Sequence, residues 1–281
     1  MEIIKSCRRM TGWAERRIAD RETICLVPTM GFFHEGHLAL MRKGCRLADN
    51  LVVSLFVNPK QFGPEEDYDS YPRDPEKDCR LARDAGAGVL FAPELNELYP
   101  PGFQTEVKVA SLTSPLCGGS RPGHFDGVTT VVAKLFNLIK PHVAVFGEKD
   151  FQQLAVIRRM VVDLNWDIDI VGHPVVRDSN GLALSSRNSY LDEEGRRKAR
   201  ELSRSLEFAA EQAGKGEAYP KGLEEEVKRR LNEYSGVEVE YAEIVQADTL
   251  EKTQLINDNS LMALAVRVDG VRLIDNRLLL R

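Results

Sequence analysis

Two histidines, His34 and His37, follow the first buried strand that the sequence predicts, residues 24–28. In open α/β sheets, ligands bind at the carboxyl ends of strands, and a helix beginning there offers free N–H groups to a phosphate. Imidazoles three residues apart share one face of a helical turn, where they can donate hydrogen bonds to oxygens that gain charge as phosphorus is attacked. We therefore predict a phosphate site. The alternatives are a pair of capping or packed histidines, and a zinc site, for which no third ligand stands out.

A second polar loop, Gly147-Glu148-Lys149-Asp150, follows the predicted strand of residues 143–146. A lysine at a strand end can reach nucleotide phosphates as a point charge, although a solvated loop is the alternative. Gln152 and Gln153 come next, and we expect one of them to face back toward the strand ends. This loop is therefore a second candidate for phosphate contacts.

Three further loops carry polar side chains suited to small ligands. Leu184-Ser185-Ser186-Arg187-Asn188 offers two hydroxyls and a guanidinium to a polyphosphate, and at a domain junction it could close over a nucleotide. Gln61 comes shortly after the predicted strand of residues 51–57 and can both donate and accept, which suits a hydroxy acid. Arg121 adds a permanent cation to a third loop, for which a structural turn is the alternative.

These loops depend on a regular alternation of strands and helices. The predicted strands are residues 24–28, 51–57, 89–92, 143–146 and 168–171, and the predicted helices are residues 36–48, 75–85, 127–139 and 150–164. Asp74 is the predicted N-cap of its helix, with Pro75 at the first helical position and Gly86 after the end. Such alternation implies parallel strands joined by right-handed crossovers. We predict an α/β fold with a Rossmann-like, doubly wound parallel sheet.

The pattern changes after about residue 176. Charged amphipathic helices are predicted at residues 192–213 and 221–234, followed by strands at residues 237–245, 261–268 and 271–274. Asp269-Gly270 between the last two strands predicts a two-residue hairpin turn. We therefore expect two domains, residues 1–176 and a smaller α+β domain of residues 177–281.

Composition excludes several classes of protein. The 281 residues are 43% hydrophobic and 29% charged, as in ordinary globular proteins. The formal net charge of −5 lacks the basic excess that binding long nucleic acid requires. The clean apolar run at residues 51–57 is far shorter than the ~18 residues of a membrane span, and no signal peptide is evident. Five cysteines without a C-x-x-C motif indicate reduced thiols in a cytoplasmic protein.

Taken together, five motifs in order resemble the pantothenate synthetase family, the pantoate–β-alanine ligases. They are Pro28-Thr29-Met30-Gly31-Phe32-Phe33-His34-Glu35-Gly36-His37, Phe56-Val57-Asn58-Pro59-Lys60-Gln61-Phe62, Ser120-Arg121-Pro122-Gly123-His124-Phe125, Phe146-Gly147-Glu148-Lys149-Asp150 and Leu184-Ser185-Ser186-Arg187-Asn188. The resemblance extends to Leu273-Ile274-Asp275-Asn276 and so covers nearly the whole chain. It implies that His-x-x-His is a version of the HIGH motif of nucleotidyltransferases, and that the C-terminal domain is a hinged lid.

The resemblance also implies the reaction. ATP and Mg²⁺ would adenylate pantoate with release of pyrophosphate, and β-alanine would then attack the bound pantoyl adenylate to give pantothenate and AMP. Family members are typically cytoplasmic homodimers. The alternatives are a nucleotidylyltransferase acting on a phosphorylated cofactor precursor, a nucleotide-binding regulatory module without turnover, and a tRNA-linked ligase fragment, which the acidic charge disfavours.

Carried over to this sequence, the resemblance assigns His37 as the catalytic histidine, with His34 and Lys149 acting beside it. Because pyrophosphate leaves well with Mg²⁺ bound, we expect hydrogen bonding by His37 rather than full proton donation. Gln61 would contact both pantoate and β-alanine, Gln153 would bind pantoate, and Arg121 would be a further substrate-binding residue. The implied ATP contacts are Met30, Gly31, Phe32, Phe33, His34, Glu35, Gly36, His37, Gly147, Glu148, Lys149, Asp150, Val176, Leu184, Ser185, Ser186 and Arg187.

Overall fold

The computed structural model describes residues 1–216 and 219–280. Contacts within the chain divide it into two compact units. The first unit consists of Met1–Ala110, Arg121–Glu148 and Gln153–Pro174, and the second consists of Ser111–Ser120, Lys149–Gln152 and Val175–Arg281. Within the described ranges, every helix is too short or too polar to span a lipid bilayer.

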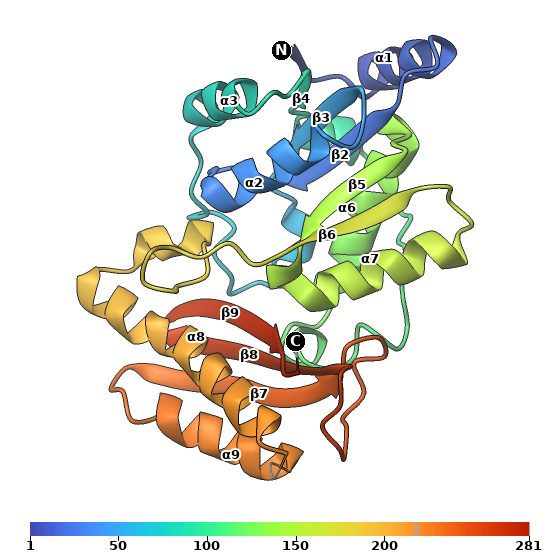
Figure 1. Ribbon diagram of the computed structural model, residues 1–281. Helices are drawn as coiled ribbons and strands as arrows, with labels where there is room; N and C mark the ends of the chain where they lie inside the picture. Colours follow the sequence, from blue (N-terminus) through green and yellow to red (C-terminus); the bar gives the residue numbers. More distant parts are fainter. Residues whose placement is uncertain (217–218, 281) are drawn as a thin grey trace. The chain divides into compact units, whose positions relative to one another are not determined.

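Among the described residues of the first unit, six parallel strands form one sheet in the order β1-β4-β3-β2-β5-β6 (Figure 1). They are β1 (Glu2–Ile4), β2 (Ile24–Thr29), β3 (Asn50–Leu55), β4 (Val89–Phe91), β5 (Val143–Gly147) and β6 (Asp169–His173). The inner strands β2 and β3 are runs of buried aliphatic residues, as expected where helices cover both faces of a parallel sheet. The predicted α/β class is confirmed.

The strand order reverses beside β2, which pairs with β3 on one side and with β5 on the other. Leu26 lies opposite both Val52 and Ala144. After β2 the chain continues to β3, toward one edge of the sheet. After β5 it continues to β6, which forms the other edge. Such a topological switch point is where open α/β sheets bind ligands, at the carboxyl ends of the strands. The loops that carry His34 and Gln61 follow β2 and β3, and Gly147 ends β5.

Among the described residues, six helices accompany this sheet: α1 (Cys7–Ala19), α2 (Glu35–Gly44), α3 (Pro75–Asp84), α4 (Leu95–Leu98), α6 (His124–Ile139) and α7 (Phe151–Asp163), of which α7 begins in the second unit. Met41 of α2 and Ala82 of α3 are buried against Cys25 and Val27 of β2. By strand alternation, Leu26 points to the opposite face, where α6 lies against β2 and α1 packs on α6.

The N-terminus of α3 confirms its predicted cap, since Asp74 Oδ1 accepts a hydrogen bond from Lys77 N (3.0 Å) and Pro75 occupies the first helical position. Three predicted helix bounds are wrong by three or four residues. The helix α2 ends at Gly44 rather than at residue 48, α6 begins at His124 rather than at residue 127, and the helix predicted at residues 221–234 ends at Leu231. Elements β1 and α1 are absent from the prediction. Several arginines dilute the apolar pattern of α1, so its buried face, which includes Met10, is hard to recognise.

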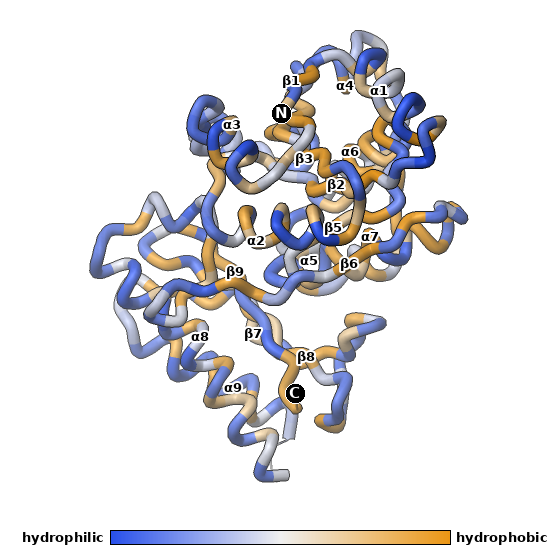
Figure 2. Tube along the Cα trace, turned by 45° about the horizontal axis from the view of Figure 1, so that its top comes forward, coloured by the Kyte–Doolittle hydropathy of each residue, from blue (hydrophilic) through white to orange (hydrophobic). Residues whose placement is uncertain are grey.

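The second unit contains an antiparallel sheet of three strands among its described residues, in the order β7-β8-β9. They are β7 (Val237–Gln246), β8 (Ser260–Val268) and β9 (Val271–Leu278), and the accompanying helices are α5 (Cys117–Ser120), α8 (Glu193–Gly214) and α9 (Pro220–Leu231). Hydrophobic and hydrophilic residues alternate along α8 and α9 (Figure 2). Their apolar faces, including Leu206 and Val227, are buried with Leu264 of β8 in one core.

The predicted hairpin turn at Asp269-Gly270 is confirmed. Both residues have positive φ, 49° and 84°, and the flanking residues Val268 and Val271 are paired. The type I′ turn requires positive φ at both central positions, which Asp and Gly tolerate well.

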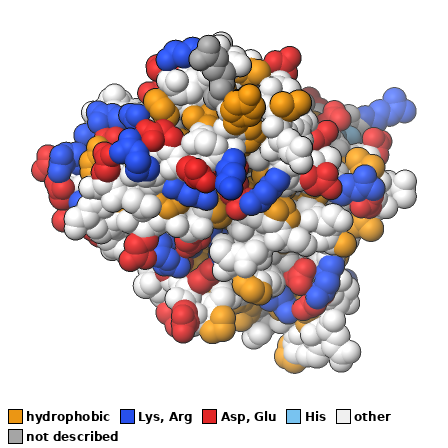
Figure 3. Space-filling model, turned by 90° about the horizontal axis from the view of Figure 1, so that it is seen from below, with side chains coloured by type: hydrophobic (Ala, Val, Ile, Leu, Met, Phe, Trp, Pro, Cys, Tyr) orange, Lys and Arg blue, Asp and Glu red, His pale blue; other side chains and the backbone are white. Residues whose placement is uncertain are grey.

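Charged side chains of both signs are interspersed on the face of the molecule drawn in Figure 3. Along helices of the second unit, charged side chains form local pairs, such as Arg197 with Glu194 and Arg229 with Glu226. These pairs are in contact with solvent and contribute little to stability. All five cysteines are free thiols, as predicted.

Candidate active site

The loop between β2 and α2 is held by a carboxylate from α3. Asp78 Oδ2 accepts a hydrogen bond from Phe32 N and Asp78 Oδ1 accepts one from Phe33 N, each at 2.7 Å. Gly31 and Phe32 both have positive φ, 89° and 52°, which turns their backbone toward α3. These two N–H groups precede α2, so the prediction that the N–H groups at the start of that helix bind phosphate stays a prediction.

The two histidines also satisfy backbone donors of this loop. His34 is the N-cap of α2, and its Nδ1 accepts a hydrogen bond from Gly36 N (3.2 Å). His37 Nδ1 accepts from His34 N (3.3 Å), and the two ring centroids are 4.1 Å apart. A neutral imidazole whose Nδ1 accepts must carry its proton on Nε2. We assign this Nε2–H tautomer to both residues from the hydrogen bonds.

This tautomer decides what the two rings can do chemically. Each imidazole has one N–H to donate, at Nε2. If Nε2 gave its proton away while Nδ1 remained an acceptor, the ring would become an anionic imidazolate, which is strongly disfavoured. The pair is therefore suited to donate hydrogen bonds to negative oxygens, as in an oxyanion hole, and is poorly suited to general acid catalysis.

The loop after β3 presents one amide side chain in a fixed orientation. Asn58 is 1% exposed, and its Nδ2 donates to Gln61 Oε1 (3.1 Å) and to Gly127 O (3.0 Å). Tyr99 Oη donates to Asn58 Oδ1 (3.0 Å). Gln61 Nε2 lies 3.0 Å from Met30 Sδ, so this loop contacts the loop after β2. Both ends of the Gln61 amide therefore have partners in the first unit, which fix its orientation.

Asn58, the residue that holds Gln61, is not among the predicted site residues, although the two stand in the same motif. The signal was present in the sequence, because an Asn directly after a buried strand must find hydrogen-bond partners if it is buried. Its partners are Gln61, Lys60, Tyr99 and Gly127, of which the last is 69 residues away in the sequence. No local pattern points to a partner that distant.

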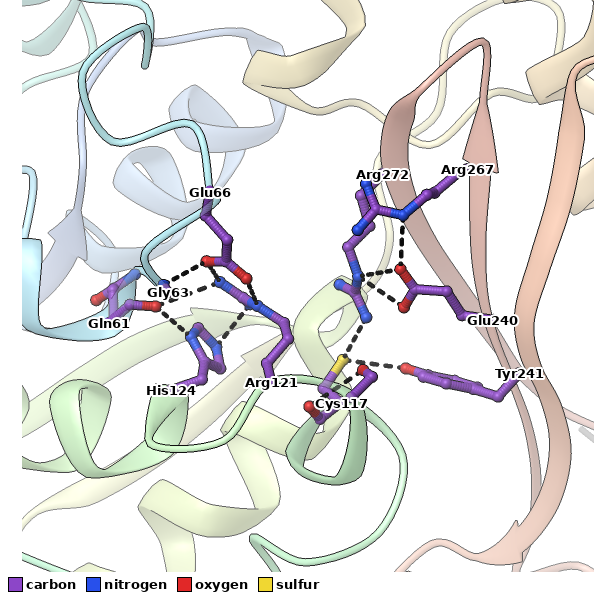
Figure 4. A network of polar contacts seen from close by, with 11 residues as sticks. Gln61, Gly63, Glu66, Cys117, Arg121, His124, Glu240, Tyr241, Arg267 and Arg272 are labelled. Atoms are coloured by element: carbon purple, nitrogen blue, oxygen red, sulfur yellow. Dashed lines mark hydrogen bonds and ion pairs between the residues drawn. The ribbon is translucent and has the colours of Figure 1, made fainter.

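Arg121 is already paired within the first unit (Figure 4). Its Nε and Nη2 donate to the two carboxylate oxygens of Glu66, at 2.6 and 2.7 Å. Arg121 Nη2 also donates to Gln61 O (3.3 Å), and His124 Nδ1 lies 2.8 Å from the same carbonyl. Burial raises the pKa of Glu66, but the hydrogen bonds and charge of Arg121 outweigh this and lower it to about 2. Arg121 thus supports the backbone of Gln61.

The loop after β5 divides between the units. Gly147 and Glu148 belong to the first unit, and Lys149 and Asp150 belong to the second. The carbonyl of Lys149 accepts a hydrogen bond from Asn276 Nδ2 (2.9 Å), which fixes the lysine backbone against β9.

The two glutamines that follow this loop differ in burial. Gln152 is 6% exposed, and its amide binds backbone groups of Leu112, Pro115 and Cys117. Gln153 is partly exposed and belongs to the first unit. Gln153 therefore remains the better candidate for a ligand contact, while Gln152 anchors the segment Ser111–Ser120.

The loop that carries Ser185, Ser186 and Arg187 is held by hydrogen bonds and an ion pair within the second unit. Leu184 N donates to Val176 O (2.9 Å), which places these two residues side by side. Arg177 and the buried Asp275 form a bidentate ion pair, at 2.6 and 2.9 Å, across the base of this loop. Ser185 caps the short helix η3 (Ser186–Tyr190), with its hydroxyl accepting from Arg187 N.

A metal site built from protein ligands alone is not evident. No group of three or more His, Cys, Asp or Glu side chains that could hold a metal ion occurs within residues 1–216 and 219–280. Mg²⁺ is commonly bound through substrate phosphates with only one or two carboxylates, so the residues present are compatible with an ion that arrives with a nucleotide.

Comparison with known proteins decides the family. Residues 2–278 match the family model described as pantoate-beta-alanine ligase. The chain belongs to the pantoate-beta-alanine ligase family. Among its curated relatives, the pantothenate synthetase of Geobacter sulfurreducens is 53% identical over 276 residues, 98% of each chain.

Solved structures of the ligase family agree with this assignment. The pantothenate synthetase of Thermus thermophilus superposes with a TM-score of 0.94 at 44% identity and 100% coverage of both chains. The pantoate-beta-alanine ligase of Francisella tularensis, complexed with beta-gamma ATP and beta-alanine, gives a TM-score of 0.84 at 32% identity, covering 99% of this chain and 97% of that one. The ligase fold therefore extends over the whole chain.

Proposed function

We propose that this chain joins pantoate and β-alanine to form pantothenate, with ATP converted to AMP and pyrophosphate. A carboxylate oxygen of pantoate would attack the α-phosphorus of ATP, and the bond from that phosphorus to the bridging oxygen would break to release pyrophosphate. The amine of β-alanine would then attack the acyl carbon of pantoyl adenylate, lose a proton and expel AMP. Family membership over nearly the whole chain supports this reaction.

The observation that carries the proposal is the pair of imidazoles at the N-terminus of α2 whose Nδ1 atoms accept backbone hydrogen bonds, in the loop that contacts Gln61. We assign to His37 and His34 the role of donors to phosphate oxygens that gain charge in the transition state. Lys149 is proposed as a cation for the same phosphates, and Mg²⁺ is proposed to enter with ATP as part of that substrate.

Gln61 and Gln153 are proposed to bind the acid substrate, with Gln61 donating from Nε2. Arg121 has a carboxylate partner in Glu66, so we assign it to the support of Gln61 rather than to direct contact with substrate. Further ATP contacts are proposed from the family resemblance for Met30–Phe33, Glu35, Gly36, Gly147, Glu148, Asp150, Val176 and Leu184–Arg187. A cytoplasmic homodimer, and division into residues 1–176 and a lid of residues 177–281, are proposed on the same ground.

The reaction is tested by measuring AMP release from purified protein with ATP, Mg²⁺ and pantoate, with and without β-alanine. AMP that accumulates only with both substrates supports the ligase. Pantoate-dependent exchange of pyrophosphate into ATP without any effect of β-alanine would keep the adenylation step and reject the acceptor. Neither activity, in a protein that binds ATP, would overturn the proposal and favour a binding module.

A further inference from the structure

A buried carboxylate on α3 lies at the base of the loop that carries both histidines. Asp78 is 1% exposed and binds two consecutive N–H groups, of Phe32 and Phe33, through separate oxygens at 2.7 Å. The loop and Asp78 are 46 residues apart in the sequence but lie in the same unit. Because His34 follows Phe33 directly, the position of its backbone depends on the two bonded peptide groups.

The backbone conformation of this loop needs such an anchor. Phe32 has φ 52°, a left-handed conformation that costs a non-glycine residue free energy. Gly31 also has positive φ, and a Cβ there would lie 2.9 Å from Asp78 Oδ2 and 2.5 Å from Leu55 Cδ1. The Asp78 carboxylate therefore lies on the inner side of this turn. Only glycine can occupy position 31 without a clash.

We propose that Asp78 is a positioning residue for the adenylation step: its carboxylate fixes the Phe32–Phe33 peptide groups and so sets the position and tautomer of His34 and His37. The chain of contacts is continuous. Asp78 holds the N–H groups of Phe32 and Phe33, His34 N donates to His37 Nδ1, and Gly36 N donates to His34 Nδ1. The catalytic part of this inference rests on the proposed function, whereas the structural part does not.

Burying the Asp78 carboxyl carries a cost in desolvation. Burial raises the pKa of Asp78, and the hydrogen bonds from Phe33 and Phe32 only partly oppose it. A carboxyl with a raised pKa in the folded state contributes stability below its usual pKa, and that contribution is lost as the pH rises through the raised value. Against the cost of burial stand the two hydrogen bonds that Asp78 accepts from the loop.

The test compares Asp78→Asn with Asp74→Asn on the same helix. Asp78→Asn preserves the shape of the side chain but replaces one carboxylate oxygen with an NH₂ group. This NH₂ group would face a backbone N–H that has lost its acceptor. Asp74 caps α3 through Lys77 N, and among its described contacts none reaches the loop after β2, so its variant controls for weakening of the helix. We expect Asp78→Asn to lower kcat of pantoate-dependent ATP–pyrophosphate exchange by about 10–100-fold, since small misplacement of catalytic groups is costly. Asp74→Asn should leave this rate unchanged.

A spectroscopic measurement separates positioning from general damage. The chain has five histidines, so ¹⁵N-histidine NMR gives a spectrum that can be assigned. We expect pure Nε2–H signals for His34 and His37 in the unaltered protein and in Asp74→Asn, and averaging of both tautomers in Asp78→Asn. Melting temperatures of the two variants should be similar.

Unchanged exchange kinetics together with unchanged imidazole signals in Asp78→Asn would overturn the proposal. If that variant does not fold, Asp78→Ser, which is smaller and keeps one acceptor, is subjected to the same two measurements with the same expectations. If the unaltered protein itself lacks pantoate-dependent exchange, the proposed function fails, and the NMR comparison still decides whether Asp78 positions the histidines.

Discussion

The loops after β2 and β3 follow neighbouring strands but are held in opposite ways. The loop after β2 is held through its N–H groups by the negative charge of Asp78. The loop after β3 is held through the carbonyl of Gln61 by Arg121 and His124. In the first loop the anchor occupies two backbone donors beside the imidazoles that we propose as phosphate ligands. In the second loop it occupies the backbone acceptor of the residue that we propose as a ligand of the acid. Each loop is thus fixed through its backbone, and by backbone groups of opposite polarity.

Replacing His37 tests the first half of this comparison and should have the largest effect. We expect His37→Ala to slow pantoate-dependent ATP–pyrophosphate exchange by about 10²–10³-fold, the usual cost of losing one donor of the oxyanion-hole type. His173→Ala, on the edge strand β6, controls for loss of an imidazole elsewhere. Exchange at the normal rate in His37→Ala would remove the phosphate role from this loop.

Replacing Gln61 tests the second half. We expect Gln61→Ala to raise KM for pantoate by about 10–100-fold, because a hydrogen bond to a charged group is lost, and to leave KM for ATP nearly unchanged. Initial rates measured with each substrate varied in turn distinguish the two constants. Equal changes in both would mean that the two loops do not divide the substrates between them.

Arg121 and its partner sharpen the comparison further. If Arg121 supports Gln61, then Arg121→Gln and Glu66→Gln should raise KM for pantoate by similar factors, about 3–10-fold, since each breaks the same partly buried ion pair. The double variant should be no worse than either single variant. If Arg121 instead bound substrate directly, Arg121→Gln would be far more damaging than Glu66→Gln, and steady-state kinetics of the three variants would show it.

The pH dependence of stability gives the smallest of these effects. The folded-state pKa of Glu66 is about 2, below its ordinary value of 4.5. Its stabilising contribution is therefore present above pH 4.5 and is lost as the pH falls toward 2, a loss that solvent screening keeps below about 3 kcal/mol. Urea unfolding from pH 7 to pH 2.5 should show the difference between the unaltered protein and Glu66→Gln shrinking over that window. A constant difference would contradict the assigned ion pair.

Local features of this fold were predictable, and the anchors were not. Asp74-Pro75 specifies the start of a helix, and Asp269-Gly270 specifies a hairpin, because both signals act within a few residues. Strand ends also placed His34 and Gln61 at the carboxyl edge of the sheet.

Asp78 and Glu66 lack any such local signal. Their partners are 46 and 55 residues away, and such pairing exists only once the sheet has formed. Asp78 lies in a helix that the sequence does predict, among other charged residues of which Glu76 is exposed. Nothing nearby in the sequence distinguishes the one buried carboxylate from them.

The anchoring of the loop after β2 also fixes the stage at which this loop loses its conformational entropy. Ordering the backbone of one residue costs about 1–2 kcal/mol, so four residues from Gly31 to His34 represent roughly 4–8 kcal/mol. Because Asp78 and the imidazoles bond this backbone within the protein itself, that cost falls on folding and not on substrate capture. ATP would therefore meet a preorganised loop, whose order should persist without nucleotide and disappear only when the first unit unfolds.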